Sequence, residues 1–278
     1  MSARLFGRWD AAQVRSLLDE HGVLAGARAR DFTDFRVDVG DVGDPAITHT
    51  RLFARKGGRD YLLCDACLTE TRIAEPPARL FTDAWTRPVE LMVVYWFSEQ
   101  DPTRSFSPGR KPLPLQQHPG LGVLRQMFES VVHMARDLGK DGVACFPKFF
   151  HDAVLFRRSR LFCFLDPRQE GVVEALERDL TDLDLADASL ALIGGAVVDG
   201  LGRAAGWTPG FQVLPLGEYL AAHFNSAAYA RAAAAAAEAR SYTVDRQRLE
   251  LARRSLADGA GRGASSTVRC DPVGAEQR

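Results

Sequence analysis

The sequence lacks the segments that direct a chain into a membrane or stabilise it with disulfides. Residues 1–8 contain no apolar stretch of the kind found in secretory signal peptides. No uninterrupted apolar run is long enough to span a bilayer. The five cysteines are odd in number and form no compact framework, which suits a reducing compartment. We therefore expect a cytoplasmic protein with no membrane span.

The sequence also lacks an excess of charge and two common catalytic motifs. Its formal net charge of −1 gives no global attraction to nucleic acid. No P-loop lysine follows the glycines, and no nucleophile elbow with a Ser-His-Asp order is present. These absences argue against a nucleotide triphosphatase, a hydrolase and a nucleic-acid partner.

A metal site is not expected, although Cys64 and Cys67 have the spacing of a zinc or redox pair. Residues 61–70 have the pattern of a strand, and residues three apart on a strand point to opposite faces. A second Cys or His pair at zinc spacing is absent. We interpret both cysteines as structural, with Cys64 on the apolar face that Leu62, Ala66 and Leu68 share.

The most informative segment is residues 116–122, Gln-Gln-His-Pro-Gly-Leu-Gly, which leads directly into an amphipathic helix. Apolar residues recur at three- and four-residue spacings over 124–138, and Gly139 is a suitable stop. A helix start has amides without intrahelical partners and favours an anion. Gly120 and Gly122 carry no side chain that would keep a ligand away from them. The segment predicts a phosphate-binding loop.

The flanking segments predict a meander of strands before this loop and alternating helices and strands after it. A helix capped by Asp10 comes first. Paired glycines join two strands into a hairpin. The expected strands are 49–55, 61–70, 80–85, 89–97, 143–146 and 161–165, with a helix at 150–158.

This order resembles the GNAT superfamily, the Gcn5-related N-acetyltransferases, whose members carry Q/R-x-x-G-x-G/A between a strand and a helix. Residues 117–122 fit that pattern, and residues 153–156 resemble the A-x-x-L/Y segment of the family's next helix. The resemblance implies an α/β (α+β) fold over residues 1–167, with a mixed, mostly antiparallel sheet flanked by helices. It also implies that the loop holds the pyrophosphate of acyl-coenzyme A. The cofactor-binding residues expected on this basis are Gln117, His118, Gly120, Leu121, Gly122 and Val123. His118 has a second interpretation, as an exposed loop side chain.

The sequence departs from the family pattern in three places. Phe156 stands where many members have a tyrosine that protonates the departing thiolate. Arg160-Leu161 replaces the usual Gly-Phe, and residues 98–116 form a long proline-rich connection. A binding pocket for acyl-coenzyme A is therefore better supported than a particular chemistry.

Two residues are expected as catalytic bases. His151, beside Asp152 at the start of a helix, has an unperturbed pKa near neutrality. Glu99 follows the central strand and can deprotonate an amine, although Asp101-Pro102 after it equally indicates a simple turn. Asp152 is interpreted as favouring the helix dipole.

Residues 168–257 are expected to form a mainly helical appendage, and residues 258–278 a disordered tail. Expected helices are 168–183, 216–224 and 226–240, with a small hairpin of residues 195–200 and 211–214. The predicted function is transfer of an acyl group from acyl-coenzyme A, or from the pantetheine of an acyl carrier protein, to a small-molecule or peptide amine. The alternative is a non-catalytic acyl-coenzyme A-binding regulatory protein on the same fold.

Overall fold

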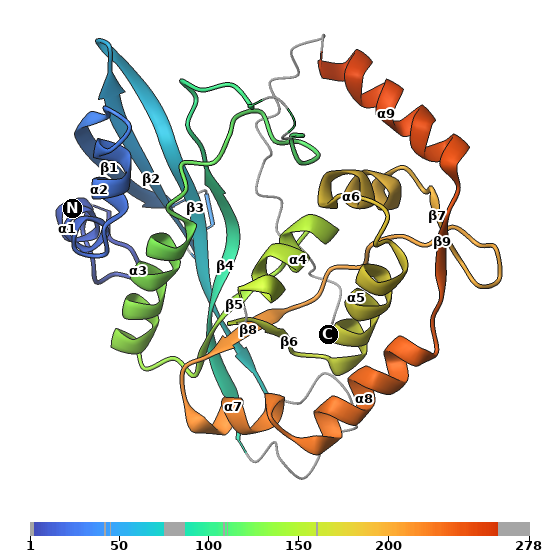
Figure 1. Ribbon diagram of the computed structural model, residues 1–278. Coiled ribbons are helices and arrows are strands. Elements are labelled where there is room, and N and C mark those ends of the chain that lie inside the picture. The colour runs from blue at the N-terminus through green and yellow to red at the C-terminus, as the bar shows by residue number, and fades with distance from the viewer. Residues whose placement is uncertain are drawn as a thin grey trace.

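A computed structural model of the chain describes residues 3–260 except 42, 45, 75–86, 108, 110 and 160. It has a mostly antiparallel seven-stranded sheet with helices on both sides, and a separate two-stranded sheet (Figure 1). The mixed α/β class predicted from the sequence is confirmed. None of the described helices has the length and apolar content needed to cross a bilayer.

The large sheet begins as an antiparallel meander and changes direction once. The strand order is β1 (Thr33–Asp41), β2 (Ile47–Lys56), β3 (Arg59–Ile73), β4 (Val89–Glu99), β5 (Gly142–Cys145), β8 (Gln212–Pro215) and β6 (Cys163–Phe164). β4 and β5 are parallel, and every other neighbouring pair is antiparallel. Because parallel neighbours need a crossover, the glycine-rich loop and the helix after it connect these two strands.

The first three helices lie on one side of the sheet, and the next three lie on the other (Figure 1). The helices are α1 (Ala11–Glu20), α2 (Val23–Arg28), α3 (Leu124–Asp137), α4 (Phe150–Arg158), α5 (Pro167–Asp179), α6 (Leu185–Ile193), α7 (Glu218–Phe224), α8 (Ala227–Glu238) and α9 (Arg246–Ala260). As predicted, Asp10 caps α1, and its side chain accepts a hydrogen bond from the Gln13 amide.

β4 is buried on both faces, which explains its nearly continuous apolar sequence. Met92 and Val94 face the core formed with α1–α3. Leu91 and Val93 face a second core on the opposite side, which Leu220 of α7 closes. Burial of each such side chain stabilises the fold by about 1.5–3 kcal/mol. This strand therefore provides a rigid support for the residues that follow Val94.

The carboxy-terminal region differs from the sequence-based expectation. Residues 195–200 and 211–214 do not form a hairpin, because β8 pairs with β5 and β6 in the large sheet. β7 (Val197–Asp199) instead pairs with β9 (Tyr242–Val244). The boundary expected after residue 167 would therefore separate β6 from β8, the strand that pairs with it.

Several elements are absent from the sequence-based prediction, namely β1, α2, α6, β9 and α9. α9 extends through Ala260, so the tail predicted from residue 258 begins too early. The strand expected at 80–85 and the tail beyond residue 260 lie outside the described residues.

Candidate functional site

The sheet opens where β4 passes the end of β5. Their last paired residues are Val94 and Cys145, whereas β4 continues to Glu99. The register between β3 and β4 also shifts here, because Cys67 is opposite Trp96 while Leu68 is opposite Val94. Tyr95 is therefore the extra residue of a β-bulge. Bulges re-aim side chains and commonly end pairing beside functional sites.

A pocket of about 80 Å³ occupies this opening. Its walls are the end of β4, the segment after β5 and the start of α4. Six aromatic side chains around it are only half-buried: Tyr95, Trp96, Phe97, Phe146, Phe149 and Phe156. Two charged side chains, Lys148 and Asp152, also line it, together with Val94, Cys145 and Pro147. Such a grouping of aromatic surface around a few polar groups is typical of a ligand site.

Asp152 has both a structural and a chemical property at this pocket. It is the third residue of α4, and the backbone amide of Phe149 donates a hydrogen bond to its carboxylate. Its side chain is 37% exposed. Burial raises the pKa of Asp152 from 3.8 to about 6. A carboxylate of that pKa is ionised at neutral pH and accepts a proton more readily than an ordinary aspartate.

His151 points away from the pocket, into the interface between α4 and α6. Its ring stacks on Phe149, and its Nδ1 lies 2.7 Å from Oγ of Ser189. Burial lowers the pKa of His151 to about 4, so the ring is neutral at physiological pH. Its Nε2 is 3.5 Å from Oδ1 of Asp152. The geometry therefore favours Asp152 over His151 as the group that meets a substrate, and a catalytic role for His151 stays a prediction.

The glycine-rich loop already surrounds an anion, the carboxylate of Glu99. Oε2 of Glu99 accepts a hydrogen bond of 2.9 Å from the Gly122 amide. The amides of Leu121 and Val123 also donate to this carboxylate and partly offset the effect of burial, which raises the pKa of Glu99. Three consecutive amides thus converge on one point in front of α3. This is the geometry of an anion-binding nest.

Glycine is needed at the two loop positions for different physical reasons. A Cβ on Gly120 would lie 2.5 Å from Oε1 of Glu99, so glycine leaves room for that carboxylate. Gly122 has a φ of +79°, which glycine adopts without strain. Glu99 therefore lies at the loop rather than free at the end of a turn, and its predicted role as a base competes with a role as an internal anion.

Arg30 adds a positive charge beside the nest. Its guanidinium lies 3.2 Å from the position that a Cβ on Gly122 would take. It also pairs with Asp101 at 3.3 Å. No sequence motif identifies Arg30, because it comes from the connection between α2 and β1, far from the loop in the chain. An incoming phosphate would meet this guanidinium as well as the amides.

The other predicted cofactor-binding residues differ in exposure. Gln117 is exposed and His118 half-buried, whereas the side chains of Leu121 and Val123 are buried. Leu121 and Val123 can therefore contribute through their backbone amides. Contact of Gln117 and His118 with a cofactor stays a prediction.

An aromatic cluster connects α3 to the pocket. The ring of Phe128 in α3 lies 6.0 Å from Phe97, 5.5 Å from Phe156 and 5.2 Å from Phe162, measured between centroids. The helix that follows the amide nest is thus packed directly against two residues of the pocket wall. Phe156 belongs to this cluster and has no proton to donate.

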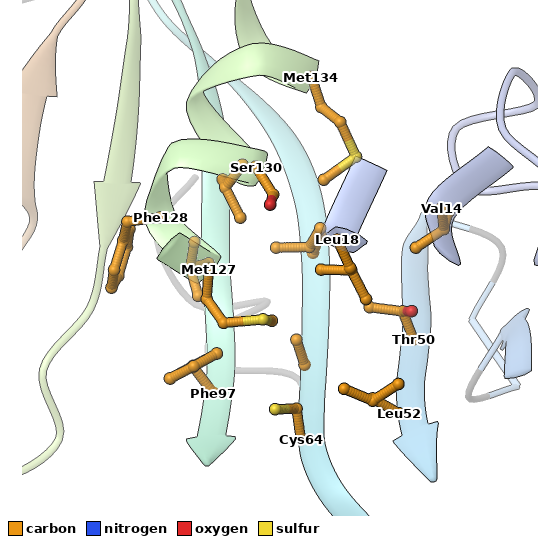
Figure 2. Close-up of a pocket in the computed structure, with 14 residues that line it drawn as sticks. Val14, Leu18, Thr50, Leu52, Cys64, Phe97, Met127, Phe128, Ser130 and Met134 are labelled. Carbon is orange, nitrogen blue, oxygen red and sulfur yellow. The ribbon is translucent and has the colours of Figure 1, made fainter. Parts of the chain in front are cut away.

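A second cavity lies deeper, between α1, α3 and the sheet (Figure 2). It holds about 30 Å³, roughly the volume share of one water molecule, and its lining is almost wholly apolar. Phe97 and Val94 line both this cavity and the pocket. Phe97 therefore separates the two spaces.

Cys64 lines the deeper cavity together with Ala66 and Leu68, as the strand pattern predicts. Leu62 leaves this face because the register with β2 shifts at Leu63. Burial raises the pKa of the Cys64 thiol well above its usual value, which makes it unreactive. In the described part of the chain, no three His, Cys, Asp or Glu side chains are grouped as metal ligands.

Comparisons with protein-family models, with curated proteins and with solved structures find no match to this chain.

Proposed function

We propose that the protein transfers an acyl group from a coenzyme A thioester, or from the pantetheine of an acyl carrier protein, to an amine. The observation that carries the proposal is the nest of amides from Leu121, Gly122 and Val123, which surrounds Glu99 at the end of β4, beyond the last residue that pairs with β5. The parallel pair that follows an antiparallel meander, with a glycine-rich crossover, agrees with the resemblance to GNAT enzymes. The amides and Arg30 would hold the pyrophosphate.

The pocket can supply the remaining requirements of a direct transfer. The amine nitrogen attacks the thioester carbonyl carbon, so a C–N bond forms and the C–S bond breaks. The nitrogen loses a proton to the Asp152 carboxylate, and the departing thiolate takes a proton from water. Holding the amine and the thioester together supplies much of the rate. A positioned base supplies about 10²–10⁴-fold more.

A non-catalytic acyl-coenzyme A-binding protein is the second candidate. Two observations favour it: the nest amides hold Glu99, one of the expected bases, and Phe156 offers no acid for the thiolate. The two candidates share the binding site and differ in whether mixing acyl-coenzyme A with an amine releases free thiol.

Gly122→Asp is expected to abolish measurable binding of acetyl-coenzyme A, because the new carboxylate repels phosphate at the nest. The matched control is Gly122→Asn, which has nearly the same size and the same positive φ but no charge. Calorimetric titration of both folded variants gives the comparison, and thiol release with mixed amines then tests for catalysis. Wild-type affinity in Gly122→Asp would remove the nest from the cofactor site and with it the proposed function.

Phe97→Ala is expected to shift the preferred acyl chain toward longer lengths, because it joins the pocket to the deeper apolar cavity. The affinities of acetyl-, butanoyl- and hexanoyl-coenzyme A provide the measurement. Phe35→Ala on β1 is the control, since it removes another half-buried ring away from the opening. An unchanged order of affinities would show that the acyl chain does not approach Phe97.

A further inference from the structure

The pocket contains one positive and one negative side chain within a lining that is otherwise mostly aromatic. Lys148 lies two residues before the start of α4, and its Nζ is 5.8 Å from the centroid of the Tyr95 ring. Asp152 lies one turn further along and contacts His151. Lys148 therefore contacts a ring, and Asp152 contacts a neutral imidazole and the Phe149 amide, so none of these contacts neutralises the charge of either side chain.

The charges constrain the ligand more narrowly than the proposed function does. A simple ammonium ion would be attracted by Asp152 and repelled by Lys148. A carboxylate would experience the reverse. A molecule that carries both groups meets a favourable partner for each, and an apolar remainder replaces water on the half-buried rings.

We propose that the acceptor is an amino acid with an apolar, preferably aromatic, side chain, bound with its amine at Asp152 and its carboxylate at Lys148. The proposal rests on the proposed function for the fate of the amine, but the binding geometry is independent of it. A pocket of about 80 Å³ encloses the charged end of such a molecule. Its side chain extends along the rings of the opening.

The reactive group is then correctly placed for transfer. The bound ammonium first loses one proton to water. The freed nitrogen then attacks the thioester carbonyl carbon and gives its second proton to Asp152, while the C–S bond breaks and the departing thiolate takes a proton from water. Lys148 stays bound to the carboxylate throughout and has no part in the proton transfer. It acts as a specificity residue, and its loss should weaken binding of the amino acid.

The test uses four probes titrated into the full chain by calorimetry without acyl-coenzyme A. L-Phenylalanine carries amine, carboxylate and ring, while 2-phenylethylamine lacks the carboxylate, 3-phenylpropionate lacks the amine and L-alanine lacks the ring. We expect L-phenylalanine to bind at least about tenfold more tightly than each of the others, as expected when a charged hydrogen bond or a buried ring is lost. Equal affinities, or binding of none of the probes, would overturn the proposal.

Two variants assign the two charges. Lys148→Gln should weaken L-phenylalanine and 3-phenylpropionate but leave 2-phenylethylamine unchanged or tighter, and Lys148→Arg should restore the carboxylate-bearing probes. Asp152→Asn should weaken L-phenylalanine and 2-phenylethylamine only. It preserves an oxygen acceptor for the Phe149 amide, so the start of α4 keeps its cap. If both folded variants lose affinity for all probes by the same factor, the assigned contacts are contradicted.

These readouts keep the two proposals apart. Selective binding of L-phenylalanine without thiol release would support this inference and reject the acyltransferase. Thiol release with simple amines, but with no preference for the amino acid, would support the acyltransferase and reject this inference.

Discussion

Asp152→Asn is expected to lower the rate of thiol release by about a hundredfold or more, the usual range for loss of a general base. Asparagine has the same size and still accepts a hydrogen bond from the Phe149 amide, so the change removes mainly the titratable charge. In the wild-type protein the rate should rise with pH through about 6, as Asp152 loses its proton. Steady-state rates with a mixture of amines at pH 5 to 8 provide the measurement. The rise in rate near pH 6 should be absent from the variant.

His151→Gln is the matched comparison, because it changes the neighbouring residue on the same turn of α4. His151 contacts Ser189 and Oδ1 of Asp152 and does not line the pocket. Its loss should reduce the rate less than Asp152→Asn does. A larger loss in His151→Gln, with a normal rate in Asp152→Asn, would return the role of base to the histidine.

The side chains of Asp152 and His151 give the free energy of unfolding opposite dependences on pH. Folded Asp152 keeps its proton up to a pKa of about 6, compared with 3.8 when unfolded, so the native state binds more protons in this window. The contribution of Asp152 to the free energy of unfolding therefore decreases as the pH rises from about 4 to about 6. Folded His151 has a pKa of about 4, below its usual 6.5, so the unfolded state binds more protons there. The contribution of His151 to the free energy of unfolding is therefore lost as the pH falls from 6.5 to about 4.

The elements that the sequence predicts well are those whose pattern follows from their own burial. The apolar run of β4 reflects cover on both faces, and the spacing in α3 reflects a single buried face. β8 is different, because its four residues contain no information on which strand they join. Pairing with β5 and β6 depends on residues far away in the chain, and a local hairpin is equally compatible with the pattern.

The candidate site is predictable in position but not in side-chain direction. The glycine pattern locates the amides, and the resemblance locates the opening beside α4. Glu99, however, turns toward the amides, and the adjacent His151 and Asp152 diverge toward α6 and the pocket. Neighbouring helical residues point about 100° apart, and only the packing of α4 decides which of them faces the opening.

Glu99→Ala is expected to raise the affinity for acyl-coenzyme A by about tenfold or more, because a site filled by an internal group is available only in a fraction of molecules. The Glu99 carboxylate accepts the Gly122 amide that a phosphate would need, and its charge repels that phosphate. Glu99→Gln should have a smaller effect, since its amide oxygen can still accept from the nest. Titration of both variants with acetyl-coenzyme A and with inorganic pyrophosphate provides the measurement.

Glu129→Gln is the control, because it removes a carboxylate from α3, the helix that follows the nest, at a position where the partner is Arg125. It should leave the affinity unchanged. Glu99→Ala should also reduce stability by about 0.5–2 kcal/mol, the usual cost of removing the side chain that caps a helix start. If stability falls while affinity stays the same or decreases, the glycines serve to accommodate Glu99 as the cap of α3. The loop would then be a structural device, and acyl-coenzyme A would have to bind elsewhere or not at all.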